Sequence, residues 1–290
     1  NIYIEHVQEQ HPISSISHTA TPRNEMIYRT DSFFPHEDYR LLGNQCYKGY
    51  EFLVMNILPY KYNPVTRTLV YYKKINIVVE TENSSKENSS RNSMLIDNEL
   101  VKKEIASLVV NPDAIDSYKK SFYRSEERIP DINNPFQMII ITDQQREAYF
   151  QDFISWKNNQ GIITGIFLTS EIYLNYNGVD NQDKIRNFII DAYQTYANTE
   201  TPLEYIFLGG DDEIIPIRGC YGAVGQTIDD SIPTDMYYSA LDGNWNLNNN
   251  DIYGEPADNP DLAPELAIGR IPAETETEFQ RFFQKNYHYV

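Results

Sequence analysis

Residues 203–218 read LEYIFLGGDDEIIPIR, and this stretch decides the fold. Tyr205–Leu208 is a short apolar run that stops at two glycines, which is typical of a strand buried on both faces. Gly209 and Gly210 allow a sharp turn, and Asp211–Glu213 then place carboxylates directly after it. In open α/β sheets, ligands and chemistry gather beyond the carboxyl ends of such strands. The stretch therefore predicts either a functional edge of a parallel sheet or a solvated turn whose acids only keep it soluble.

Strand-like and helix-like segments alternate on both sides of this stretch. The predicted strands are Gln137–Thr142, Ile162–Leu168, Tyr205–Leu208 and Leu266–Gly269. The predicted helices are Arg146–Asn159, a helix capped by Asp180, and a helix opened by the capping box Thr275–Glu278. The order β-α-β-α-β implies a parallel sheet with right-handed crossovers, so the predicted fold class is α/β. The long connection before the last strand is expected to hold a hairpin near Met236–Ala240.

The first part of the chain has the pattern of a β-rich domain. Tyr50–Leu58 and Leu69–Glu80 are predicted strands, with a turn around Asn63 between them. Because a single hairpin is not stable alone, we expect further strands and a small β-sandwich or curled sheet. Thr81–Ser93 is predicted to be a polar loop, and Met94–Val110 is predicted to hold a helix.

Charge divides the chain into two parts. Residues 1–130 carry 16 Lys and Arg against 17 Asp and Glu, a net of −1, whereas residues 131–290 carry 8 against 25, a net of −17. We therefore predict two domains, residues 1–128 and 129–290. Lys119–Pro135 has four cationic and few apolar residues, so it is expected to be an exposed linker that proteases cut after Arg124 or Arg128.

The composition also restricts partners and location. A formal net charge of −18 disfavours nucleic acid and anionic lipid and favours cations such as calcium. No apolar run approaches the roughly 18–20 residues of a membrane helix, so we expect no membrane span. The chain opens on a polar segment without Met, so a signal peptide is expected to have been removed. The two cysteines, Cys46 and Cys220, form no zinc spacing and no disulfide framework.

A polar loop at residues 241–255 is the candidate metal site. Counted from Asn244, side-chain oxygens fall at loop positions 1, 3, 5, 7 and 12, the spacing of a calcium loop, although Asn249 replaces the usual glycine. The candidate ligands are Asp242, Asn244, Asn246, Asn248 and Glu255, with Asp211 in a neighbouring site. The alternative is an Asn-rich turn that holds itself together by side-chain-to-backbone hydrogen bonds.

Two other kinds of site find little support. A nucleophilic Cys220 would need a base, and His288 is the only histidine after residue 130. Nothing in the sequence brings the two together. A dinucleotide site would need a glycine-rich turn after the first α/β strand, and Thr142-Asp143 is not one.

The motifs as a set resemble the gingipain-type cysteine peptidases, which are related to the caspases. The blocks of the second domain that are similar are MIIIT, FISWKNNQG (Phe153–Gly161), YIFLGGDDEIIP, TDMYYSALDG (Thr234–Gly243), LAIGRIP and the ETETEF…YHY helix. The earlier run YKGYEFLVMNILPYKYNPVTRTLVYYKKINIVV is similar to gingipain propeptides. The resemblance thus covers most of the chain. It implies a propeptide-like domain followed by the first α/β subdomain of a catalytic domain.

The resemblance implies a bacterial cysteine endopeptidase made as a zymogen, secreted or at the cell surface, supported by calcium and acting on peptide or protein substrates. Its catalytic His, in a Gly-His-Gly setting, precedes its Cys, and both follow a second subdomain. Here no Gly-His-Gly occurs, and Cys220 precedes His288. The resemblance therefore assigns no catalytic residue, and we expect the chain alone to be inactive. The alternatives are a non-catalytic gingipain-like surface-assembly domain and a lone calcium-binding module.

Overall fold

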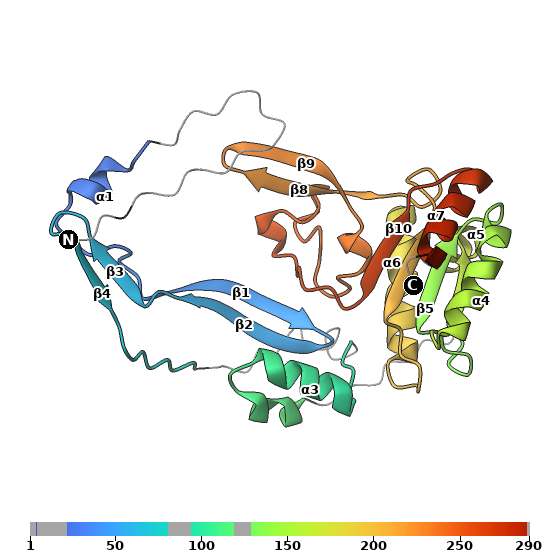
Figure 1. Cartoon of the computed structure of the whole chain (residues 1–290), viewed down its shortest axis with the longest axis horizontal. Coiled ribbons are helices and arrows are strands. Elements are labelled where there is room, and N and C mark those ends of the chain that lie inside the picture. Colours follow the sequence, from blue (N-terminus) through green and yellow to red (C-terminus); the bar gives the residue numbers. More distant parts are fainter. Residues whose placement is uncertain (1–3, 5–21, 81–93, 119–128, 289–290) are drawn as a thin grey trace. The chain divides into compact units, whose positions relative to one another are not determined.

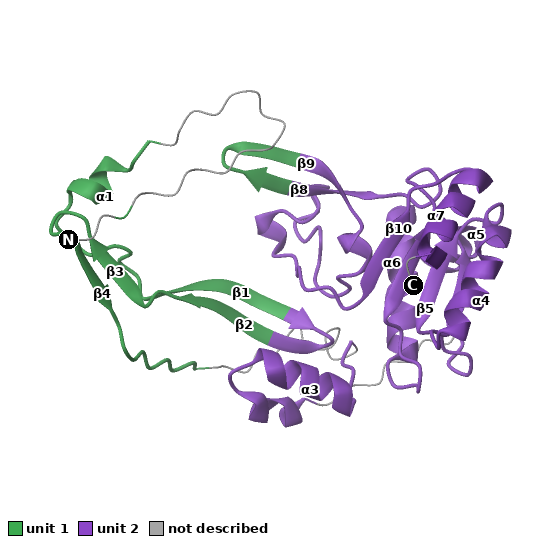
Figure 2. Ribbon diagram, viewed as in Figure 1, with its two compact units in different colours: residues 1–45, 52–84, 222–229 green, residues 46–51, 85–221, 230–290 purple. Residues whose placement is uncertain are grey.

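The computed structural model describes residue 4 and residues 22–80, 94–118 and 129–288. The contacts divide the chain into two compact units, shown in Figure 2. Unit 1 comprises residues 1–45, 52–84 and 222–229, and unit 2 comprises residues 46–51, 85–221 and 230–290. The predicted domain boundary at residue 128 is not where these units divide, because unit 2 includes residues 46–51 and 85–118 of the predicted first domain. The predicted loop Thr81–Ser93 and the predicted cut sites Arg124 and Arg128 lie outside the described residues.

Unit 2 is built on a parallel sheet of four strands in the order β10-β7-β5-β6. Its strands β5 and β10 are labelled in Figure 1. Its strands are β5 (Met138–Thr142), β6 (Thr164–Leu168), β7 (Tyr205–Gly209) and β10 (Ala267–Ile271). All five residues of β5 are buried, as expected for a central strand covered on both faces. The predicted parallel α/β sheet is therefore confirmed.

Helices cover both faces of this sheet. They are α4 (Gln151–Asn159), which follows the 3₁₀ turn η2 (Glu147–Phe150), and α5 (Thr169–Asn175), α6 (Asn181–Tyr196) and α7 (Glu276–His288). On one face, Phe150, Phe153, Phe279 and Phe283 from η2, α4 and α7 pack against Ile140 of β5. On the other face, Phe188 of α6 contacts the ring of Phe167 in β6 at 4.9 Å. Successive side chains of β5 point to opposite faces of the sheet, so β5 contributes to an apolar layer on each face.

The helix ends follow their sequence signals in part. The Asp180 carboxylate accepts a hydrogen bond from Asp183 N at 2.8 Å, which confirms the predicted cap of α6. At α7, the Glu278 carboxylate accepts Thr275 N at 3.0 Å, as predicted. The Thr275 hydroxyl donates to the same carboxylate at 2.9 Å instead of accepting a backbone N–H. The predicted capping box is therefore half formed.

The long connection before β10 holds a hairpin in a different place from the predicted one. β8 (Arg218–Val224) pairs with β9 (Thr227–Thr234), and Gly225, at φ +62°, lies in the turn between them. Met236–Tyr238 forms the 3₁₀ turn η3 instead of a strand, and Pro256–Asp258 forms a second such turn, η4. The prediction near Met236 was wrong because aromatic residues there pack inward from a turn, with Tyr237 and Tyr238 buried.

The N-terminal part is β-rich, as predicted, but its strands pair differently. The elements are α1 (Glu25–Arg29), β1 (Tyr39–Tyr47), β2 (Tyr50–Ile57), β3 (Tyr60–Asn63) and β4 (Thr68–Tyr71). In the described residues these strands form two two-stranded sheets, β1-β2 and β3-β4, in place of a sandwich. The predicted strand Leu69–Glu80 was wrong after Tyr71, because the alternating residues that follow leave the β3-β4 ladder.

Two helical elements of unit 2 precede the parallel sheet. They are α3 (Glu99–Leu108), which confirms the helix predicted within Met94–Val110, and the 3₁₀ turn η1 (Pro112–Ser117). Asn98 caps α3 by accepting a hydrogen bond from Val101 N at 2.8 Å. No helix among the described residues is both long enough and apolar enough to pass through a membrane.

Candidate functional site at the carboxyl edge of the sheet

The predicted functional edge forms where β5 and β7 end. The Thr142 hydroxyl donates to Gly209 O at 2.7 Å and ties the two strand ends together. A side chain on Gly209 would lie 2.5 Å from the Phe150 ring, so this strand end can pack closely only as glycine. Beyond it, Ile215 N donates to Asp211 O at 2.9 Å and closes the turn. The edge is therefore a tight backbone turn laid over the aromatic core.

Arg270, near the end of β10, holds this turn in place. Its guanidinium forms a two-pronged ion pair with Asp235, with both N–O distances below 3 Å. It also donates to three carbonyl oxygens of the turn, those of Gly210 (3.1 Å), Asp211 (2.9 Å) and Ile215 (2.6 Å). Sequence reasoning missed Arg270, although an arginine at the end of a predicted strand, within LAIGRIP, was a usable signal.

Two acids meet at the same edge. A hydrogen bond with Asp211 and the charges of Asp211 and Glu213 raise the pKa of Glu274, which lies between β10 and α7. Arg146 approaches from the start of η2, where it pairs with Asp143 at 2.6 Å and donates to Glu274 O at 3.2 Å. The edge therefore presents acidic side chains around an ordered turn, and it can attract cationic groups.

Both cysteines of the chain, Cys46 and Cys220, are buried in unit 2, and Cys220 is the one within the α/β part. Cys220 lies in β8 and is buried, and burial raises the pKa of its thiol to about 11. His288 is on the last turn of α7, where its Nδ1 lies 2.8 Å from Gln284 O. A protonated, buried thiol is a poor nucleophile. Burial thus disfavours the thiolate form that a nucleophilic Cys220 would need.

The Asn-rich loop folds by hydrogen bonds between its side chains and its backbone. Asn246 Oδ1 accepts Asn250 N at 3.0 Å, and Asn244 Oδ1 accepts Asn246 N at 2.9 Å. Glu255 Oε1 accepts the side-chain amides of Asn248 and Asn250 at 2.6 and 2.7 Å. The first two bonds are the side-chain-to-backbone bonds expected for a self-supporting Asn-rich turn, whereas the Glu255 bonds join side chains.

Two features of the loop were not foreseen from the sequence. Asn249 adopts φ +57°, the left-handed conformation that a glycine would supply at this position, and Asn is among the residues that tolerate it. The buried Asp258 carboxylate accepts backbone N–H groups from both arms of the loop, including Leu247 (2.7 Å) and Gly254 (3.1 Å). Asp258 is therefore the residue that organises the loop.

Asp242 lies away from the other loop candidates, in a buried acidic cluster. Its side chain is 5% exposed and lies near Cys46 and Glu265. Burial and the charge of Asp242 raise the pKa of Glu265 to about 8. Glu265 Oε2 accepts Leu241 N at 2.6 Å, whereas its Oε1 is buried without a hydrogen-bond partner. No sequence pattern beyond the acids themselves predicts this cluster.

The six candidate calcium ligands thus fall in three places: the loop from Asn244 to Glu255, the buried Asp242, and Asp211 at the sheet edge. The loop supplies the oxygen chemistry that calcium takes, but its oxygens are turned to backbone or amide N–H groups. Among the described residues, no group of three or more His, Cys, Asp or Glu side chains is arranged to hold a metal ion. As folded here, the candidates do not converge on one ion.

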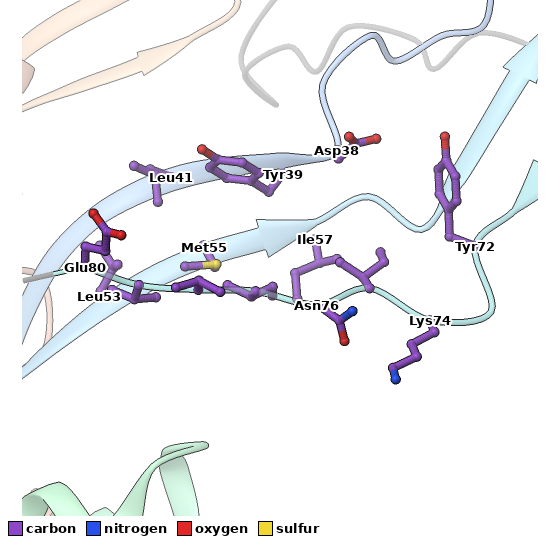
Figure 3. Close-up of a pocket in the computed structure, with 14 residues that line it drawn as sticks. Asp38, Tyr39, Leu41, Leu53, Met55, Ile57, Tyr72, Lys74, Asn76 and Glu80 are labelled. Atoms are coloured by element: carbon purple, nitrogen blue, oxygen red, sulfur yellow. The ribbon is translucent and has the colours of Figure 1, made fainter.

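Unit 1 contains an apolar groove of about 640 Å³, shown in Figure 3. It lies between the β1-β2 ribbon and the extended segment that follows β4, and Tyr39, Leu41, Leu53 and Met55 line it. The groove includes none of the candidate site residues.

The sheet order and the ordered turn at its carboxyl edge define an open α/β domain whose candidate site lies at the carboxyl ends of the strands. The model of Peptidase family C25 matches residues 131–290, and that of the C25 propeptide matches residues 6–109. The chain therefore belongs to Peptidase family C25, with part of a propeptide and part of a peptidase domain.

Individual relatives agree with this assignment. The chain is 25% identical over 268 residues to gingipain R2 of Porphyromonas gingivalis, covering 90% of this chain and 30% of that protein. Gingipain R1 of the same species is also 25% identical and is covered to 22% of its length. This chain thus spans less than a third of these relatives.

Solved structures are similar over about half of the chain. The complex of P. gingivalis RgpB pro- and mature domains is 24% identical, with a TM-score of 0.37, over 53% of this chain and 29% of that chain. Dimeric latent PorU from P. gingivalis is 16% identical, with a TM-score of 0.40, over 53% of this chain and 15% of that chain.

Proposed function

We propose that the chain is the N-terminal part of a cysteine endopeptidase zymogen whose His/Cys dyad lies outside these 290 residues. The observation that supports this most is the order of the two family matches, propeptide before peptidase. The matched peptidase segment folds as the sheet that would carry such a dyad. Both thiols of this chain, those of Cys46 and Cys220, are buried. This chain would then supply scaffold and part of the wall of the substrate cleft.

The reaction follows from general cysteine-peptidase chemistry. The His base takes the thiol proton, the thiolate attacks the scissile carbonyl carbon, and the amine leaves with the proton that His returns. Water then hydrolyses the thioester and regenerates the thiol. Backbone N–H groups stabilise the oxyanion in both steps. We propose peptide or protein substrates, and secretion or a cell-surface location.

Turnover of a peptide library under reducing conditions tests this function. The chain of 290 residues is expected to be inactive, whereas the longer natural protein should cleave peptides and lose activity with a thiol-alkylating reagent. The same protein carrying Cys220→Ala should keep its activity. Activity of the short chain that disappears in Cys220→Ala would contradict the proposal. An inactive longer protein would favour a non-catalytic assembly domain.

We also propose that the loop from Asn244 to Glu255 binds calcium weakly, with a dissociation constant of roughly 10⁻⁴–10⁻³ M, the range of extracellular modules. Its support is the oxygen-rich loop and the excess of acids in residues 131–290. Binding would require the Asn248 amide to turn its oxygen towards the ion. Asp242 and Asp211 would then not be ligands of this calcium ion, because each lies elsewhere among its own acidic neighbours.

Excess calcium is therefore expected to raise the melting temperature relative to chelator. At 100 times the dissociation constant the ion adds about 2.7 kcal/mol, which corresponds to roughly 5–10 °C. Glu255→Gln should remove most of this rise, whereas Glu276→Gln, at an exposed acid of α7, should leave it intact. A melting temperature that calcium does not change would refute the site.

We propose that maturation cuts the chain after Arg124 or Arg128. The four cationic residues and the few apolar residues of Lys119–Pro135 support this proposal, because such a composition is typical of segments that proteases cut. Limited trypsin digestion should cut first between residues 119 and 128 and leave two resistant pieces that elute together. First cuts within Phe136–Gly210 would show that the boundary is misplaced.

A further inference from the structure

Most of the buried apolar residues that the structure describes within the propeptide match lie in two short segments of unit 2, and the others, Val101 and Ile105, lie on α3. In the first, Cys46 and Tyr50 are 1% and 2% exposed. In the second, Met94, Leu95 and Ile96 are each at most 5% exposed. The rest of β1 and β2 is largely exposed. These two segments, Cys46–Tyr50 and Met94–Ile96, are called the anchor below.

The anchor is held together by a turn with one required glycine. Lys48 and Gly49 have φ of +53° and +82°, the left-handed pair of a type I′ hairpin turn. A Cβ on Gly49 would lie 2.4 Å from Leu95 Cα and 2.5 Å from Leu95 N, so the two segments pack backbone against backbone. Lys48 O accepts Ile96 N at 3.2 Å. The two segments therefore form one element.

A helix of the propeptide match completes this element. The Glu104 carboxylate of α3 accepts Tyr47 Oη at 2.8 Å and pairs with Lys48 Nζ at 2.7 Å. Both contacts come from the turn. The anchor is therefore also held by contacts within the propeptide match.

The peptidase segment contacts the anchor at two points. The Asp261 carboxylate, 6% exposed, accepts the backbone N–H of Cys46 through Oδ2 and that of Ala263 through Oδ1 at 2.9 Å. Gln194, on the last turn of α6, donates to the Met94 sulfur at 3.6 Å. Burial, with smaller contributions from Glu265 and Cys46, raises the pKa of the neighbouring Tyr193. These groups come from residues 131–290 and face a single propeptide element.

We propose that Asp261 and the last turn of α6 form a reversible docking site whose ligand is the propeptide anchor. The site takes a tight hairpin turn whose Cys46 N–H donates to Asp261, together with the apolar residues Met94–Ile96 that pack against this turn. The last turn of α6 leads into the amino end of β7, so the anchor docks opposite the Gly210 turn. Docking there retains the propeptide segment and can open without unfolding the parallel sheet.

The two buried thiols allow the opening to be measured in the intact chain. Alkylation of Cys46 measures opening of the anchor. Alkylation of Cys220, which is buried in β8, measures unfolding of the peptidase segment. Alkylation by iodoacetamide is followed at each thiol by peptide mass spectrometry. Each rate is divided by that of the same thiol in the urea-denatured chain, which removes differences in intrinsic reactivity. The native chain should protect both thiols.

Gly49→Ala and Asp261→Ala should each raise the alkylation rate of Cys46 about tenfold or more, while Cys220 changes less than twofold. The first adds a methyl group against the Leu95 backbone, and the second leaves the Cys46 N–H unpaired. Gly43→Ala is the matched control, because it adds a methyl group at a positive-φ glycine of β1 with no atom within 4 Å.

Continued protection of Cys46 in both variants would overturn the proposal. So would exposure of both thiols in parallel, since opening would then be global unfolding. The inference relies on the proposed zymogen function only for the biological role of retention. Thiol exposure is measured without substrate, so this test can fail while the turnover test succeeds, and the reverse.

Discussion

Arg270→Ala is expected to lower the free energy of unfolding by about 3 kcal/mol, the largest effect of any single charged residue considered. The substitution removes both prongs of the ion pair with Asp235 and three hydrogen bonds to the turn after β7. Breaking a buried pair from one side costs about 3–5 kcal/mol, and the lower end applies because the Arg270 side chain is still 13% exposed.

Urea unfolding followed by circular dichroism measures this change. Arg281→Ala removes the same charge from an exposed position on α7 and should change stability by less than about 0.5 kcal/mol. Arg270→Lys should recover only part of the loss, because an ammonium cannot bridge Asp235 and three carbonyls in one plane. Equal midpoints for Arg270→Ala and Arg281→Ala would show that Arg270 does not hold the turn.

Phe150→Ala is expected to cost about 3–5 kcal/mol, the range for deleting a buried aromatic ring. Phe150 is fully buried, and its ring contacts those of Phe207, Phe279 and Phe283 at 5.4–6.1 Å. The ring also lies under Gly209, so the cavity would open directly beneath the functional edge.

Phe282→Ala provides the comparison for this cavity. Its ring is half-buried and stacks on Phe207 at 5.9 Å, so its loss should cost about half as much. The midpoints of urea unfolding should rank the variants in that order. Equal losses for the two variants would mean that the core is not centred on Phe150.

The parallel sheet was predictable because its strands are short, apolar and separated by strongly periodic helices. β5 and β7 were placed to within a residue, since a strand buried on both faces leaves a continuous apolar run. The N-terminal strands were less predictable. Leu69–Glu80 alternates as a strand should, yet alternation cannot say which partner a strand finds, and the ladder ends at Tyr71.

The candidate site was predictable only in outline. The turn after β7 and the polar loop stand out in sequence, because glycines and runs of Asn have few other uses. The residues that hold them, Arg270 and Asp258, lie outside the turn and the loop in sequence. Arg270, for example, donates to the carbonyl oxygen of Gly210, 60 residues earlier in the chain. No local pattern marks such contacts. The docking of Cys46 on Asp261, 215 residues away, is hidden for the same reason.

Mapping the cysteine that a peptide-based, thiol-reactive inhibitor labels tests the central claim most directly. The experiment uses the longer natural protein after maturation, in reducing buffer, and locates the label by peptide mass spectrometry. We expect one cysteine outside residues 1–290 to be labelled, with Cys46 and Cys220 unmodified, because both thiols are buried. A label on Cys220 would contradict the assignment of the dyad to a part of the protein outside this chain.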